Sequence, residues 1–136
     1  MTNEKPQDAN ALKGKTGLRR LLNAFGYSLQ GFRAAWQNEA AFREEAMLTI
    51  VLTPVALLLP VTGVEKLHLI LSLLLLVLVE LLNSAVEAVV DRIGPEIHPL
   101  SGRAKDLGSA AVLIACLILG LTWLFIALPA VLGLFL

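Results

Sequence analysis

Four polar residues recur at spacings of three and four within an otherwise apolar segment rich in Leu, Val and Ala: Glu80, Asn83, Glu87 and Asp91. At about 100° per residue these side chains fall within one narrow sector of a helix. Acids and amides are costly to place in hydrocarbon, and where they occur they usually mark a functional site. A set of satisfied interhelical hydrogen bonds is the weaker interpretation, because the segment offers the carboxylates neither cations nor protons.

The residue types around this stripe indicate phosphoryl transfer. Hard oxygen ligands come from Glu39, Glu80, Glu87, Asp91 and Asp106. Such oxygens suit Mg²⁺, which prefers a few carboxylates together with substrate phosphates, whereas no Cys/His cluster favours zinc or copper. Cations that could hold a polyphosphate come from Arg20, Arg92, Arg103 and Lys105. Together with an apolar setting, these groups predict transfer of a phosphoryl group to a lipid hydroxyl.

The composition is that of an integral membrane protein. Apolar residues make up 57% of the 136 residues and charged residues only 16%, which is too apolar for a soluble domain of this size. The polar first twenty residues predict no cleaved signal peptide. The single cysteine, Cys116, lies in an apolar run, and we expect it to pack as a small apolar side chain.

We expect an all-α fold in which every element serves to position the stripe. A disordered tail is expected over residues 1–16 and a membrane kinase domain over 17–136. The domain is expected to contain an amphipathic surface helix at 17–45 and spans at about 46–64, 67–90 and 107–128. Pro54 and Pro60 should bend the first span or end it early, and Pro129 should stop the third. Glu65 and Lys66 should form a short turn, and residues 91–106 a loop in which Gly94-Pro95 and His98-Pro99 break the helices.

Basic residues set the expected orientation. Seven of the eleven Lys and Arg residues precede Met47, and three more lie between Asp91 and Asp106. The positive-inside rule therefore places the amino terminus and the 91–106 loop in the cytoplasm and the carboxyl terminus outside. Small residues on the second and third spans, Ser84 among them, are expected to allow close helix packing. Since three spans enclose four polar side chains poorly, we expect an oligomer whose neighbouring subunit closes the site.

Three runs carry a resemblance to a known family: Asn38–Arg43, Glu80–Arg92 and Ser101–Ala111. They closely resemble the bacterial integral-membrane diacylglycerol kinases, part of a superfamily with the undecaprenol kinases, and the likeness extends from about Arg20 to Trp123. It implies a homotrimer with shared sites at the bacterial inner membrane. It also implies that each subunit uses MgATP to convert diacylglycerol to phosphatidic acid, in lipid recycling for phospholipid synthesis.

The resemblance also implies roles for individual residues. Glu80 matches the general base and Asn83 the residue that orients it, while Glu39 and Glu87 match the carboxylates that hold the magnesium. The nucleotide is then expected to contact Arg20, Tyr27, Glu39, Glu87, Glu96, His98, Lys105 and Asp106. The lipid substrate is expected to contact Arg20, Ala24, Arg33, Trp36, Glu45, Glu80, Ser109 and Trp123.

Other functions are compatible with parts of the pattern. An undecaprenol kinase would show the same acidic stripe, although Trp123 and the 38–43 run look more like the diacylglycerol branch. A small proton-coupled multidrug transporter would also carry an intramembrane Glu, but all the acids here crowd toward the cytoplasmic side. A non-catalytic membrane scaffold predicts that replacing Glu80 with glutamine changes no activity.

Overall fold

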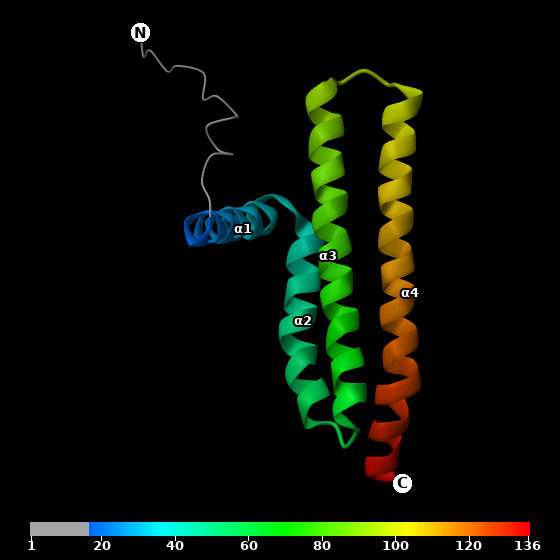
Figure 1. Ribbon diagram of the computed structural model, residues 1–136. Coiled ribbons are helices and arrows are strands. Elements are labelled where there is room, and N and C mark those ends of the chain that lie inside the picture. The colour runs from blue at the N-terminus through cyan, green and yellow to red at the C-terminus, as the bar shows by residue number, and fades with distance from the viewer. Residues whose placement is uncertain (1–16) are drawn as a thin grey trace. The chain divides into compact units, whose positions relative to one another are not determined.

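Four helices account for nearly all of the part of the chain that the computed structural model describes, residues 17–136 (Figure 1). They are α1 (Leu18–Asn38), α2 (Ala40–Leu58), α3 (Gly63–Ile93) and α4 (Pro99–Phe135). The expected all-α class is confirmed, while the tail expected over residues 1–16 lies outside the described residues. The chain divides into two units, one ending at Ala34 and the other covering Ala35–Leu136.

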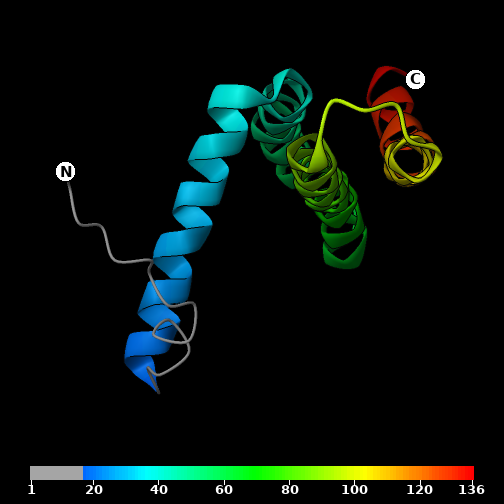
Figure 2. The same cartoon turned by 90° about the horizontal axis from the view of Figure 1, so that it is seen from above.

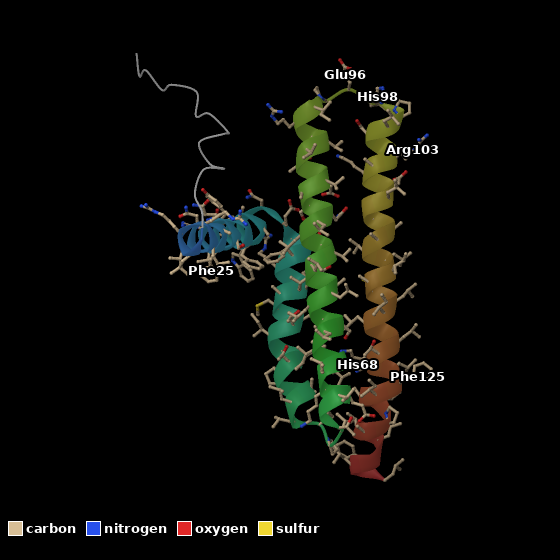
Figure 3. All side chains as sticks on the ribbon, in the orientation of Figure 1. Phe25, His68, Glu96, His98, Arg103 and Phe125 are labelled. Carbon is tan, nitrogen blue, oxygen red and sulfur yellow. The ribbon has the colours of Figure 1, made fainter. Side chains whose placement is uncertain are left out.

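The first unit consists of most of α1, a helix with an apolar face. Leu21, Phe25, Leu29 and Phe32 recur every three or four residues and expose about half or more of their surface, between 47% and 67%. Figure 3 labels Phe25 on this helix. The amphipathic character expected of this segment is therefore present.

The amphipathic segment ends earlier than the sequence suggests. A single helix was expected over 17–45, but Glu39 adopts an extended backbone (φ −117°, ψ 107°) and is the N-cap of α2. Arg43 Nη1 donates a hydrogen bond to the carbonyl of Trp36 at 2.8 Å and so satisfies one of the last carbonyls of α1. The break makes Glu39 and Glu45 part of the helical bundle formed by α2, α3 and α4.

Helix α2 ends before a proline. The helix α2 continues through Pro54 and ends at Leu58, and Leu59 turns extended because it precedes Pro60. Of the two prolines expected to bend this segment or end it early, Pro60 is followed by no further turn of α2, so an early end is confirmed, whereas Pro54 lies within the helix.

The expected turn at Glu65 and Lys66 is wrong, since both residues lie in the first turn of α3. Thr62 and Glu65 form a capping box, in which Thr62 N–H donates to Glu65 Oε2 at 2.8 Å and Glu65 N–H donates to Thr62 Oγ1 at 3.2 Å. Lys66 Nζ donates to the carbonyl of Leu57 at 2.7 Å and ties the end of α2 to the start of α3.

The connection from α3 to α4 is much shorter than the expected loop at 91–106. Gly94 leaves α3 with φ 155°, a conformation that favours glycine, and α4 begins at Pro99. Pro99 starts the helix instead of breaking it, because a proline at the first helical position lacks only an N–H that would have no partner in the helix. Pro129 does not stop the helix either, since α4 continues to Phe135.

Helix α3 lies between α2 and α4 and contacts both (Figure 2). Near the α2–α3 connection, Ala56, Leu59, Leu69 and Ala127 form a buried cluster, against which Val61, Ile70, Trp123, Ile126 and Ala130 pack. We call these nine residues the turn-end cluster. Among the described helices, α3 and α4 have the length and apolar composition needed to cross a membrane.

Candidate active site

Three of the four stripe residues lie together on α3, as the helical spacing predicted. Glu80 is 5% exposed, and Asn83 and Glu87 are half-buried. Asn83 Nδ2 donates a hydrogen bond to Glu87 Oε1 at 3.4 Å. The stripe is therefore an inward-facing group of oxygen atoms and not a solvated helix face.

Helix α2 adds further carboxylates to this group. Glu39 and Glu87 lie close enough to the buried carboxylate of Glu80 to repel its negative charge, and Glu80 does the same to Glu45. Acidic groups from α3 and from the start of α2 thus lie near one another. Like charges repel, and a cation bound among them would relieve that repulsion.

Three buried polar atoms in this region have no hydrogen-bond partner among the described residues. They are Glu45 Oε2, Asn83 Oδ1 and Ser84 Oγ. Buried polar atoms are normally paired, and an unpaired one costs roughly 1–3 kcal/mol. Their concentration beside the acidic group indicates a site that a ligand completes. Sequence reasoning treated Ser84 only as a small packing residue, because its polar role depends on how the helices meet.

Asp91 departs from the expected stripe. Its side chain is 66% exposed and forms a salt bridge from Oδ1 to Lys105 Nζ at 2.7 Å. An exposed pair of this kind contributes little to stability, typically 0–1 kcal/mol. Lys105 and Asp106 are exposed in the early turns of α4, so this pair places the Lys105 ammonium beside the polar end of α3.

The predicted lipid contacts Ser109 and Trp123 lie at different levels of α4. Ser109 is exposed and follows Gly108, which lies against Asn83. Trp123 belongs to the turn-end cluster, and its Nε1 donates to the carbonyl of Leu69 at 3.3 Å. Since Leu69 precedes Glu80 by eleven residues, this contact lies about 16 Å along α3 from the acidic group. The structure does not bring Trp123 together with the stripe.

The loop after α3 forms a small hollow. A cavity of about 260 Å³ is lined by Ile93, Gly94, Glu96, His98, Leu100 and Ser101. Figure 3 shows Glu96 and His98 on this connection, at the opposite end of the bundle from the turn-end cluster. His98 Nδ1 accepts a hydrogen bond from the N–H of Leu100 at 3.1 Å and caps α4. The two predicted nucleotide contacts of the loop therefore share one cavity.

The remaining predicted contacts lie on α1. Arg20, Ala24, Tyr27 and Arg33 are exposed in the first unit, where Leu21, Leu22, Ala24, Phe25 and Ser28 line an apolar hollow of about 520 Å³. Trp36, in the last turns of α1, is 45% exposed. These side chains are accessible to a ligand.

The donor set fits magnesium better than a metal that needs a complete protein cage. The described residues contain no group of three or more His, Cys, Asp and Glu side chains that could hold a metal ion. Glu39 and Glu87 are two carboxylates that both lie near the buried carboxylate of Glu80. Mg²⁺ typically takes one or two protein carboxylates and completes its octahedron with phosphate oxygens and water.

Comparison with known proteins places this arrangement in a family. The sequence model described as prokaryotic diacylglycerol kinase matches residues 26–127, which include the whole acidic stripe. The chain belongs to the prokaryotic diacylglycerol kinase family. A diacylglycerol kinase of Pseudomonas aeruginosa is 55% identical over 116 residues, which cover 85% of this chain and 94% of that protein.

Two further members of the family show how far the similarity extends. The diacylglycerol kinase of Escherichia coli K12 is 55% identical over 108 residues, covering 79% of this chain and 88% of that protein. The Helicobacter pylori 26695 enzyme is 42% identical over 107 residues, covering 79% and 84%. The resemblance expected from the three sequence runs is confirmed.

Proposed function

We propose that this protein phosphorylates diacylglycerol with ATP and so makes phosphatidic acid, in lipid recycling for phospholipid synthesis. The observation that carries the proposal is the group of acids formed by Glu80, Glu87 and Glu39, with unpartnered polar atoms beside it, within the region that matches the kinase family. Phosphoryl transfer needs positioned groups and charge neutralisation more than covalent chemistry from the protein. A buried acidic group next to an apolar helix surface provides both for a lipid alcohol.

Glu80 is the residue that accepts the proton of the lipid hydroxyl. It is the most buried of the site's carboxylates, and its side chain forms no hydrogen bond or salt bridge with another described residue. Asn83, one helical turn further along α3, holds its amide nitrogen toward Glu87 and so orients the groups around the reacting atoms.

Glu39 and Glu87 would hold the magnesium of MgATP. The bound ion would neutralise charge on the transferred phosphate. Nucleotide contacts from Lys105, Asp106, Glu96 and His98 surround the α3–α4 connection, and Arg20 and Tyr27 supply contacts from α1. Lys105 can exchange its exposed partner Asp91 for a phosphate oxygen at little energetic cost.

The proposed membrane setting has three spans. α3 and α4, which are long and apolar enough to cross a membrane, span the inner membrane, and α2 adds a third span. The apolar face of α1 then faces lipid at the cytoplasmic interface. The lipid then meets Arg20, Ala24, Arg33, Trp36, Glu45, Glu80 and Ser109, whereas Trp123 packs in the turn-end cluster. Three subunits assemble so that neighbours cover the exposed apolar helix surfaces and complete shared sites.

A radiolabelled ATP assay tests the proposal. Purified protein in mixed micelles is given diacylglycerol or undecaprenol, and the labelled lipid is measured with and without Mg²⁺. We expect labelled phosphatidic acid that depends on Mg²⁺. Labelling of undecaprenol alone would overturn the choice of lipid. Substrate uptake by proteoliposomes without ATP, and no labelling of either lipid, would favour a transporter.

A further inference from the structure

Gly108 of α4 faces the amide of Asn83 on α3. A Cβ atom added at Gly108 would overlap Asn83 Oδ1 and would lie 3.3 Å from Asn83 Cγ and 3.9 Å from Asn83 Cβ. The three nearest atoms to this added carbon therefore all belong to one side chain. The Asn83 amide therefore occupies the space that a methyl group at position 108 would fill.

The orientation of this amide is determined by its two neighbours. Asn83 Nδ2 donates to Glu87 Oε1 at 3.4 Å, and an ionised carboxylate can only accept, so the NH₂ group of Asn83 faces Glu87. The amide oxygen consequently points at the backbone of α4, where it is buried without a hydrogen-bond partner among the described residues. Only a residue without a side chain leaves room for an oxygen there.

We propose that Gly108 is a positioning residue of the kinase, which acts by holding the Asn83 amide with its nitrogen toward Glu87. This inference rests on the proposed function of Glu80, Asn83 and Glu87. Because the atom that an alanine would meet is the end of a side chain and not backbone, the Asn83 amide moves and the two helices stay packed. The predicted defect is therefore one of chemistry and not of folding.

Gly120 supplies a matched control on the same helix. A Cβ added at Gly120 meets no atom within 4 Å. Gly108→Ala and Gly120→Ala both replace a helical glycine by a better helix former, so their effects on helix stability should be alike. They differ in that Gly108→Ala displaces Asn83.

Steady-state kinetics in mixed micelles give the first readout. We expect Gly108→Ala to lower kcat roughly 10- to 100-fold, because a shift of about 1 Å in a positioning group can cost that much. The KM values for MgATP and diacylglycerol and the melting temperature should match those of Gly120→Ala. A kcat equal to that of Gly120→Ala, or a loss that follows a lower melting temperature, would overturn the proposal.

The second readout does not depend on activity. The side-chain amide resonance of Asn83 in an NMR spectrum is assigned by its absence in Asn83→Ser. We expect this resonance to shift in Gly108→Ala and not in Gly120→Ala, and an unmoved resonance would refute the positioning role. A wild-type protein that phosphorylates no lipid would defeat the proposed function, whereas the resonance would still test the contact between Gly108 and Asn83.

Discussion

Two regions of α3 use polar groups in opposite ways. At and beside the turn-end cluster, polar side chains find partners: Trp123 Nε1 and Ser72 Oγ both donate to the carbonyl of Leu69, at 3.3 and 2.7 Å. Further along the same helix, Asn83 Oδ1 and Ser84 Oγ are buried without partners beside the carboxylate of Glu80. Polar groups in the first region are therefore paired, whereas those in the second carry the cost of burial without a partner.

The two regions also differ in how they are packed. Leu69 is fully buried with Ala56 and Ala127 from the two flanking helices, so three helices meet in a dry cluster. A rigid apolar end of this kind can hold the other end of α3 in place while its acids repel one another. Breaking either end should therefore produce a distinct type of defect.

The largest expected effect comes from Glu80→Gln. Removing a general base costs about 10²- to 10⁴-fold in rate, so phosphatidic acid formation should fall by that factor while the protein stays folded. Glu44→Gln, an exposed change on α2, is the control and should retain the wild-type rate. A Glu80→Gln enzyme that turns over within a few-fold of Glu44→Gln would show that the stripe is not catalytic.

Leu69→Ala tests the opposite end of the helix. A fully buried leucine replaced by alanine typically lowers the free energy of unfolding by about 2–5 kcal/mol, because a cavity remains. Denaturant unfolding in micelles should show this loss, while KM for MgATP is unchanged in the folded fraction. Leu71→Ala, at a half-exposed position, should cost less, and equal losses would mean that the cluster has no special role.

How much the sequence predicted can be seen at particular residues. The 100° periodicity placed Glu80, Asn83 and Glu87 correctly. An unbroken helix fixes the angle between successive side chains, so residues at this spacing must lie on one face. The periodicity failed for Asp91, near the end of α3, where the exposed side chain turns to Lys105 instead. Periodicity describes one helix and carries no information about a cation supplied by the next.

Chain breaks were harder to foresee. Glu39 ends one helix and begins the next without proline or glycine, so nothing local marked the break. Pro99 and Pro129 were expected to interrupt structure, but the first starts a helix and the second is accommodated within it. The contact between Gly108 and Asn83 depends on the register of α3 against α4, which the sequence alone does not define.

A smaller effect is expected from the carboxylates that would hold the metal. Glu39→Gln and Glu87→Gln should each raise the Mg²⁺ concentration for half-maximal activity about tenfold or more, since an amide is a weaker ligand than a carboxylate. Titration of activity against Mg²⁺ measures this, with Glu44→Gln as the control. Unchanged titrations would remove the metal role from both residues.

The smallest effect should come from Trp123→Phe. Phenylalanine keeps most of the packing in the turn-end cluster but loses the hydrogen bond to the carbonyl of Leu69. Hydrogen bonds between membrane helices contribute about 0.6 kcal/mol on average, so the melting temperature should fall slightly and the rate should hold. A large loss of rate at unchanged stability would instead indicate direct contact with the lipid substrate.

In the proposed mechanism Glu80 accepts the proton of the lipid hydroxyl and does not hold the nucleotide. Isothermal titration of MgATP into folded Glu80→Gln separates these two roles. We expect a Kd close to that of the wild-type protein despite the lost turnover. Loss of MgATP binding in a protein that is still folded would contradict it and would make Glu80 a metal ligand.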